Sequence, residues 1–478
     1  MNGTALAVAL VAFVLLMLGI GMRARSRVRS AEDYLVAGRR LSLPLASATL
    51  FATWFGAGTM LTASDQIRAE GLGAAALEPI GPGLCLVLAG AFFAGRLWRM
   101  KLLTLSDFYR RRFGPRAEVL ASVIMVPGYF GWIAAQFVAL AGILELFWGI
   151  PLRHGLWLVA AVGTWYTLLG GMWSVTLTDA AQAALIVVGL AVLAATMLAK
   201  LAAAGGLDAL VGSVPAEHLK LVPAGDPAAL VGWLSVLAVG ALGNIPGQDL
   251  AQRIFSARSD RVASLACVVS GVLYVALGLV PAFVGLAADA LGVQTSRSTV
   301  PALAAALMTP ALGIVFVLAI IAAVMSTIES AILAPSSVLA HNLLAKLEPR
   351  ASTIALTKVA ILGVAACSLG VAYSGSSAYE LLESAYAVGM VGLFVPLVCG
   401  LHGRRGDERA ALAAMAAGIG IWMAHLALGW DTFAGPWLDV PVPQELAATG
   451  IAWAAYEGLA VGAAYRRRWV IAPRLRGS

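Results

Sequence analysis

The fold of this chain is decided by residues 45–65, which read LASATLFATWFGAGTMLTASD. The stretch is long and apolar enough to cross a bilayer, yet its middle, residues 52–58, is poor helix material. In hydrocarbon every backbone N–H and C=O needs a partner inside the protein, because an unpaired group costs several kcal/mol. We therefore expect a helix that is broken in mid-membrane, with freed carbonyl groups that hold a cation beside a bound solute.

The composition is that of a polytopic membrane protein. Of the 478 residues, 60% are hydrophobic and 12% charged, and the mean hydropathy is +0.88. The net charge of +7 is divided among short segments between apolar runs, which favours membrane orientation over nucleic-acid binding. The four cysteines lie in apolar runs without the spacing of a zinc site or a disulfide framework.

Thirteen apolar runs have roughly the 20 residues that a membrane span needs. Four arginines follow the first run, so we interpret it as a retained helix and not as a cleaved signal peptide. The runs are 3–22, 42–67, 73–95, 118–148, 155–172, 177–203, 228–250, 263–288, 311–334, 354–373, 380–401, 410–428 and 447–465.

The distribution of basic residues predicts the orientation in the membrane. With the N-terminus outside and thirteen alternating spans, 27 of the 32 Lys and Arg residues fall on the inner side. We therefore expect a multi-pass protein of the cell (inner) membrane with a cytoplasmic C-terminus. Residues 204–227 and 429–446 are then longer outer segments, either lids or, as we favour, plain connectors.

A second run shows the same interruption, at residues 242–249, LGNIPGQD. Each broken run opens a group of five spans. Because five is an odd number, the two groups insert with opposite orientation, as in transporters with inverted repeats. Close helix packing is the alternative explanation for the glycines. The predicted division is 1–40 (extra helix and cytoplasmic loop), 41–203 (first repeat), 204–227 (extracellular loop), 228–403 (second repeat) and 404–478 (two further helices and a cytoplasmic tail).

Five stretches along the chain form an ordered set of motifs. They are FATWFGAG (51–58), TLSDFYRRRFG (104–114), WYTLLGGMWSVTLTDAAQ (165–182), GNIPGQDLAQRIFSARS (243–259) and AAVMSTIESAIL (322–333). These stretches resemble the sodium:solute symporter family, which carries them in the same order, and their sequences are most similar to the branch that contains high-affinity choline transporters. The resemblance implies an all-α membrane fold of about 13 transmembrane helices, with a LeuT-type 5+5 inverted repeat whose first and sixth core helices are broken.

Ser326 and Thr327 lie in an otherwise apolar span, where hydroxyl groups usually bond back to the preceding turn. Sodium prefers hard oxygen ligands, and a reversible site favours carbonyl and hydroxyl groups. The family resemblance implies sodium ligands at the carbonyls of Ala52, Phe55 and Ala323 and at the two hydroxyls. The i, i+3, i+4 spacing places the last three on one helical face.

Asp179 begins a pattern, Asp-x-x-Gln, that is common at helix caps. The resemblance links this position to the sodium exit path and, in some members, to a second sodium site with serines of the ion-binding span. Here Glu329 replaces one of those hydroxyls, beside Ser330. Glu329 is then an ion ligand, a proton-titrating group or the partner of an arginine, unless it lies near the inner surface and is hydrated. The number of coupled ions stays open.

Eight residues on the predicted cavity walls are candidates for solute binding. Aromatic faces suit a quaternary ammonium, although core packing or an interfacial belt explains such aromatics equally well. The resemblance to choline transporters extends to two of the tryptophans, but those relatives carry a third where this chain has Gly247, which argues against choline itself. The candidates are Trp54, Gly56, Tyr129, Trp132, Gln136, Asn244, Gly247 and Gln248.

We conclude from the sequence that the chain is a secondary active transporter, a sodium-coupled symporter of a small organic solute working by alternating access. The solute is an amino acid, a quaternary ammonium or a carboxylate, and the other partner is the lipid bilayer, with no nucleic acid and no obligate protein. Proton coupling, or a solute sensor of the same fold, are the alternatives. A channel would not need paired broken helices. A membrane enzyme would need a nucleophile and base or a metal cluster, and the sequence shows neither.

Overall fold

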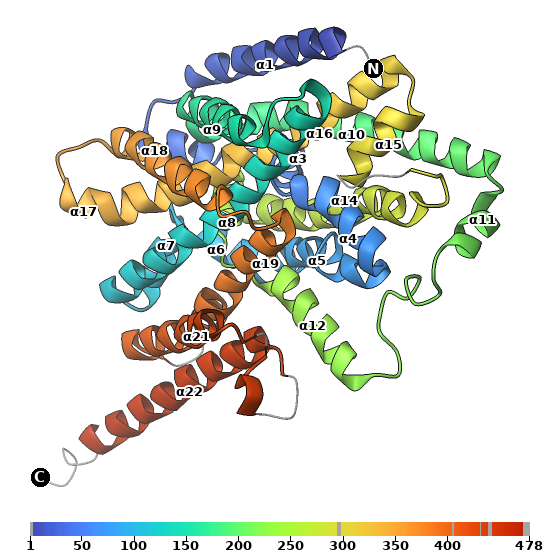
Figure 1. Ribbon diagram of the computed structural model, residues 1–478. Helices are drawn as coiled ribbons and strands as arrows, with labels where there is room; N and C mark the ends of the chain where they lie inside the picture. Colours follow the sequence, from blue (N-terminus) through green and yellow to red (C-terminus); the bar gives the residue numbers. More distant parts are fainter. Residues whose placement is uncertain (1–2, 294–297, 404–405, 431, 438–441, 472–478) are drawn as a thin grey trace, which may run out of the picture.

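A computed structural model describes residues 3–293, 298–403, 406–430, 432–437 and 442–471, and this part of the chain is almost entirely helical (Figure 1). Its only β-type pairing consists of two isolated bridges, Leu41 with Ala257 and Thr432 with Pro443. The predicted all-α class is confirmed. The helices are α1 (Gly3–Arg25), α2 (Ala31–Val36), α3 (Leu43–Trp54), α4 (Ala63–Glu70), α5 (Ile80–Leu88), α6 (Gly95–Arg99), α7 (Leu105–Arg112), α8 (Pro115–Trp148), α9 (Leu152–Leu168), α10 (Gly171–Ala203), α11 (Gly206–Ser213), α12 (Pro227–Leu242), α13 (Gln248–Ser256), α14 (Asp260–Ala287), α15 (Thr299–Leu307), α16 (Pro310–Val338), α17 (Ala345–Leu347), α18 (Thr353–Ala372), α19 (Ala378–Gly389), α20 (Val395–Leu401), α21 (Glu408–Leu428) and α22 (Gln444–Ile471).

Several of these helices join end to end into longer spans. Among the described residues, nine continuous helices are long and apolar enough to cross a membrane. The halves α3 and α12 are apolar but too short to cross alone, as broken helices require. The count of thirteen spans stays a prediction. The nine are Gly3–Arg25, Leu72–Arg99, Pro115–Trp148, Gly171–Ala203, Asp260–Ala287, Pro310–Leu347, Thr353–Ala372, Ala378–Leu401 and Glu408–Leu428.

The first predicted break is present. Helix α3 ends at Trp54, and Phe55 leaves the helical region with φ −78° and ψ 66°. The chain returns to a helix through a π-helical turn, Gly58–Thr62, before α4. A Cβ on Gly56 would collide with the Thr327 hydroxyl and lie 2.7 Å from Gln136 Oε1. Glycine is therefore needed here for close approach to α16 and α8.

The second predicted break is also present. Helix α12 ends at Leu242 and α13 begins at Gln248, with extended backbone at Gly247 (φ −77°, ψ 137°). A Cβ on Gly389 would collide with the Gly243 carbonyl oxygen, so the interrupted segment lies directly against α19. Both interruptions that the sequence predicted are confirmed.

The centre of the molecule is α16, which packs against α3, α8, α10 and α13. Figure 1 shows α1 along one edge of the assembly and the pair α21 and α22 at the opposite edge. All residues of α16 from Ala319 to Val338 are buried. A hydroxyl on this part of α16 therefore faces protein on every side and not lipid.

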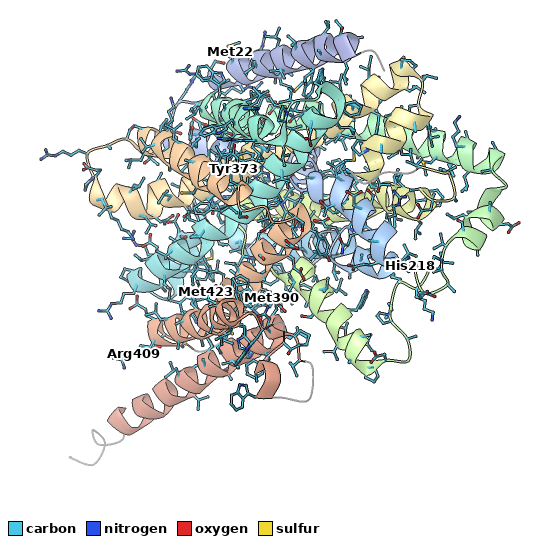
Figure 2. All side chains as sticks on the ribbon, in the orientation of Figure 1. Met22, His218, Tyr373, Met390, Arg409 and Met423 are labelled. Carbon is cyan, nitrogen blue, oxygen red and sulfur yellow. The ribbon has the colours of Figure 1, made fainter. Side chains whose placement is uncertain are left out.

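The connection between α11 and α12 lies against the start of the next span. The backbone N–H of Leu72 donates to the carbonyl of His218 at 2.8 Å, and the Trp233 indole donates to the carbonyl of Gly73 at 3.1 Å. Figure 2 shows His218 on this connection. The predicted outer segment 204–227 is thus attached to the chain that follows the first broken helix.

Candidate sodium and solute site

The end of α3 meets α16 at a cluster of oxygen atoms. The Ser326 hydroxyl oxygen lies 2.8 Å from the Ala52 carbonyl oxygen and 2.8 Å from that of Ala323. The Thr327 hydroxyl donates to the Ala323 carbonyl at 3.1 Å. All four residues are fully buried. A hydroxyl has one proton and donates to one carbonyl at a time, so the cluster keeps oxygen lone pairs of the kind that a hard cation takes as ligands.

The break lies beside this cluster. Phe55 is the first residue after α3, and its N–H donates to the Phe51 carbonyl at 2.9 Å. The next free donor, the Ala57 N–H, is satisfied by Gln136 Oε1 at 2.8 Å. The predicted solute residues Gly56 and Gln136 therefore hold the broken backbone in place. The five predicted sodium ligands come from the two elements that the structure brings together here.

A second cluster lies on the same side of α3. Asp179 is fully buried; the Thr49 hydroxyl donates to its Oδ2 at 2.5 Å, and Arg253 Nη2 lies 3.7 Å from the same oxygen. Ser330 joins the cluster through a 3.0 Å hydrogen bond with Thr53. The helix-cap interpretation of Asp179 was wrong, because α10 begins at Gly171 and Asp179 lies two turns inside it.

Glu329 is buried with this cluster. Its exposed fraction is 1%, and the Thr178 hydroxyl donates to Oε2 at 3.4 Å. The alternative of a hydrated Glu329 near the inner surface is therefore wrong. Two buried carboxylates, Asp179 and Glu329, face one guanidinium, that of Arg253. If all three are ionised, one negative charge lacks a partner within the cluster.

Arg253 was missed as a site residue. Its place in the sequence suggests one of the basic residues of an inner loop, but Arg253 lies in α13 and is 1% exposed. Its Nη1 donates to the Asp249 carbonyl at 3.0 Å, and its Nη2 donates to the Ser330 hydroxyl. The available signal was its position only six residues after Gly247, within the second half of a broken helix.

A small cavity of about 40 Å³ lies beside the second break. Four of the predicted solute residues line it: Tyr129, Trp132, Asn244 and Gly247. Tyr129 and Trp132 come from α8, and the other two come from the segment between α12 and α13.

The other four predicted solute residues do not line this cavity. Gly56 and Gln136 support the first break, as described above. Gln248 turns away, and its Oε1 accepts from the Leu105 N–H at 2.7 Å. Trp54 contacts a lining residue instead: its indole N–H donates to Asp249 Oδ2 at 2.6 Å. The assignment of these four residues to solute binding stays a prediction.

Two carboxylates near the cavity were also missed. Asp249 lines it and is 4% exposed. Glu78 accepts hydrogen bonds from Thr59 (2.6 Å), Tyr274 (2.8 Å) and Tyr386 (2.9 Å), and so joins the first break to a wall of the cavity. Both follow a glycine- or proline-containing interruption of an apolar run, which was the signal that could have found them.

The segment 104–114 is hydrogen-bonded to the C-terminal continuation of α16. Thr104 and Asp107 form a capping box at the start of α7. Asn342, in the π-helical continuation of α16, donates to Asp107 Oδ1 at 2.9 Å and to Glu118 Oε1 at 2.8 Å. Burial raises the pKa of Asp107, but hydrogen bonds from His341, the Thr104 N–H and Asn342 outweigh it, and the pKa is lowered from its ordinary value.

The family model described as "Sodium:solute symporter family" matches residues 34–418, which include both broken helices and α16. The chain belongs to the sodium:solute symporter family. The family predicted from the motifs is confirmed, and it is a family of sodium-coupled transporters, not of enzymes.

Relatives within the family have different solutes in their names. The chain is 29% identical over 358 residues to the human high affinity choline transporter 1, covering 70% of this chain and 61% of that protein. It is 27% identical over 447 residues to the sodium/pantothenate symporter of Escherichia coli (strain K12), covering 87% and 89%. The chain thus spans about three fifths of the length of the human choline transporter and nearly all of the pantothenate symporter.

Solved structures confirm the fold. A substrate-bound, outward-open Na⁺-coupled sialic acid symporter matches with a TM-score of 0.75 at 18% identity, over 94% of this chain and 96% of that one. Mhp1, a nucleobase-cation-symport-1 family transporter, matches with a TM-score of 0.60 at 16% identity, over 90% and 95%. The predicted LeuT-type architecture is therefore confirmed.

Proposed function

We propose that this protein is a sodium-coupled symporter that moves a small organic solute across the cell membrane by alternating access. The observation that carries the proposal is the position of Ser326, 2.8 Å from the carbonyl oxygens of both Ala52 and Ala323. Its hydroxyl bridges a broken helix and the central helix at a fully buried point. Sodium, as the transported co-substrate, binds there through the oxygens of Ala52, Phe55, Ala323, Ser326 and Thr327.

The choice of sodium follows from the donor set. The atoms are neutral carbonyl and hydroxyl oxygens, which bind a hard monovalent cation reversibly. A cage of carboxylates would hold an ion too tightly for release on every cycle. The family to which the chain belongs agrees with sodium as the coupling ion.

Coupling to the solute runs through the end of α3. Ala52 offers its carbonyl to the ion, and two residues later Trp54 donates a hydrogen bond to Asp249 on the cavity wall. An ion that fixes the last turn of α3 therefore also fixes one wall of the solute cavity. This is a physical link between the two sites, through a single turn of backbone.

One coupled ion supplies enough free energy for accumulation. A sodium ion moving down about 100 mV gains roughly 2.3 kcal/mol, and a tenfold concentration ratio adds about 1.4 kcal/mol. Together these support roughly 500-fold accumulation of an uncharged solute. The relatives' names include choline, pantothenate and proline, so the solute here is a small amino acid, quaternary ammonium or carboxylate.

The topology belongs to the same proposal. The N-terminus lies outside and the C-terminus in the cytoplasm, with the repeats at 41–203 and 228–403. Removing the buried Arg253 from the orientation count leaves 26 of 31 basic residues inside, so the asymmetry stands.

Uptake into proteoliposomes tests the function. Labelled choline, betaine, proline and short carboxylates are offered with and without an imposed sodium gradient. Ser326→Ala and Thr327→Ala should raise the half-maximal sodium concentration by about tenfold or more, since each removes one ion ligand. Ser336→Ala is the matched control, because Ser336 is equally buried on α16 and donates to the Ile332 carbonyl of its own helix at 2.6 Å. Unchanged sodium dependence in both site variants would contradict the assigned ion site.

Proton coupling is the second candidate, and the buried cluster of Asp179, Glu329 and Arg253 favours it. With two carboxylates and one guanidinium, the cluster is electrically balanced when it holds one further cation, a proton or a sodium ion. A pH gradient imposed without sodium separates the two. Uptake driven by protons alone and lost in Glu329→Gln would establish proton coupling.

A further inference from the structure

The cavity beside the second break contains a buried carboxylate, that of Asp249, which forms no ion pair with a described residue. Asp249 is 4% exposed and lines the cavity. Its two carboxylate oxygens accept hydrogen bonds from neutral donors, Oδ1 from the Tyr129 hydroxyl at 2.5 Å and Oδ2 from the Trp54 indole at 2.6 Å. Among the described residues no Lys, Arg or His nitrogen lies within 4.0 Å of either oxygen.

The nearest basic residue is already committed elsewhere. Arg253, one turn along α13, donates to the backbone carbonyl of Asp249 and directs its guanidinium to Asp179 and Ser330. Arg253 attracts the Asp249 carboxylate from beyond 4.0 Å. A buried carboxylate that has no directly paired cation is costly in a low-dielectric interior. Each carboxylate oxygen accepts up to two hydrogen bonds, so both oxygens keep room for a further donor.

Gly247 keeps the approach to this carboxylate open. A Cβ at this position would lie 2.8 Å from Asp249 Oδ1 and 3.4 Å from the Tyr129 hydroxyl. Any larger residue would therefore cover the carboxylate from the side of the interrupted segment. Three aromatic side chains, those of Tyr129, Trp132 and Tyr386, also line the cavity, together with aliphatic residues.

The position of Asp249 also reverses the usual electrostatics of a broken helix. The N-terminus of a half-helix carries a partial positive charge that attracts anionic groups of a solute. Asp249 is the second residue of α13, so the chain's own carboxylate takes that place. An anionic group of a solute would meet a like charge there, whereas a cationic group would meet its counter-ion.

We propose that Asp249 is the counter-ion of a protonated primary or secondary amine on the transported solute. An N–H-bearing ammonium donates to the free lone pairs of Asp249, while its charge lies over the aromatic walls. The cavity of about 40 Å³ has room on the order of a few water molecules, enough for a small ammonium head. A quaternary ammonium has no N–H to donate. This inference rests on the proposed transport function and names its solute class.

The test is equilibrium binding to the purified full-length protein in detergent with sodium present. Labelled ethanolamine is the probe, and N-methylethanolamine, choline and ethanol are the competitors. Ethanolamine and its mono-methyl derivative should bind at least about tenfold more tightly than choline, and ethanol should not compete. Choline binding as tightly as ethanolamine, or no ethanolamine binding at millimolar concentration, would overturn the proposal.

A variant pair gives a second readout. Asp249→Asn keeps the shape and removes the charge, and should weaken ethanolamine binding by about thirtyfold or more, since it removes one partner of a buried charged pair. Asp260→Asn, also in the first turn of a helix but paired with Arg99 at the surface, should leave binding unchanged. Equal ethanolamine affinity in Asp249→Asn and wild type overturns the assignment.

Sodium-driven uptake is measured in a separate experiment, so that failure of the amine site at Asp249 can be distinguished from failure of the proposed sodium symport. Ethanolamine that binds but is not accumulated by a sodium gradient would contradict the symport and leave the amine site standing. Sodium-driven uptake of choline, with no competition by ethanolamine, would overturn the amine site and leave the symport standing.

Discussion

The Trp54 indole donates a 2.6 Å hydrogen bond to Asp249 Oδ2, and so joins the last residue of α3 to the first turn of α13. Trp54 directly precedes the first break and Asp249 lies just after the second, although the two residues are 195 positions apart in the chain. The proposed ion site at the end of α3 and the cavity beside α13 therefore share one fixed contact. In the proposed mechanism, binding at either site acts on this pair of side chains.

Removing that contact should uncouple the two sites. Trp54→Phe keeps an aromatic ring and deletes the N–H donor. Asp249 Oδ2 then lacks this hydrogen bond, and leaving a buried acceptor unsatisfied costs about 1 to 3 kcal/mol of free energy. We expect roughly tenfold weaker apparent affinity for both sodium and solute in uptake assays. Trp157→Phe is the control, because Trp157 is 60% exposed. Normal sodium affinity in Trp54→Phe would show that the contact does not couple the sites.

A methyl group at the first break should block the site by its volume. In Gly56→Ala the added Cβ would collide with the Thr327 hydroxyl and approach Gln136 Oε1 at 2.7 Å. Overpacking of this kind costs about 1 to 3 kcal/mol, and we expect uptake to be lost. In Gly142→Ala, on α8, the new Cβ has no neighbour within 4 Å, so activity should be normal. Active transport by Gly56→Ala would contradict the close approach of α3 to α16.

Breaking the buried ion pair between Arg253 and Asp179 should strongly destabilise the folded protein, and a second substitution should restore part of the lost stability. Arg253→Gln leaves Asp179 without its guanidinium partner, and breaking a buried pair costs about 3 to 5 kcal/mol. Adding Asp179→Asn removes the stranded charge, so the double variant should recover part of the loss. Thermal unfolding in detergent measures both. Additive losses in the double variant would show that the two residues act independently.

The pH dependence of stability follows from Asp107. Its pKa is lowered in the folded protein, so its carboxylate contributes stability above its ordinary pKa of 3.8, and this contribution is lost as the pH falls through the folded pKa. Asp107→Asn should therefore lower the melting temperature at pH 7, by a loss of about 1 to 3 kcal/mol, and the gap to wild type should narrow below about pH 4. The exposed Asp208→Asn serves as control. A gap that is constant from pH 7 to pH 3 would exclude a charged Asp107 as the stabilising group.

Several features could be predicted from local sequence because their causes are local. The interruptions at 52–58 and 243–247 follow from glycine and proline in apolar runs, and the structure has both. The hydroxyls of Ser326 and Thr327 lie on one face of α16 because helical geometry fixes that spacing. The protein family could be predicted because its five motifs can be read directly from the sequence in their order.

The errors came from side chains whose partners are distant in the chain. Asp179 looked like a helix cap because its neighbours fit that pattern, whereas its partner Arg253 lies 74 residues away on α13. Arg253 looked like a loop charge for the same reason. Trp54 stays a predicted solute residue, and the direction of its indole depends on the distant Asp249.

The sequence by itself determined that the chain is an all-helical membrane protein of this family with two broken helices, because hydrophobicity and backbone preference act over a few residues. Only the tertiary structure decided which polar side chains meet. Asp249 faces the solute cavity, and Asp179 pairs with Arg253, because helix packing brings α3, α10, α13 and α16 together. A buried charge must find a partner wherever packing supplies one, and no local pattern specifies that partner.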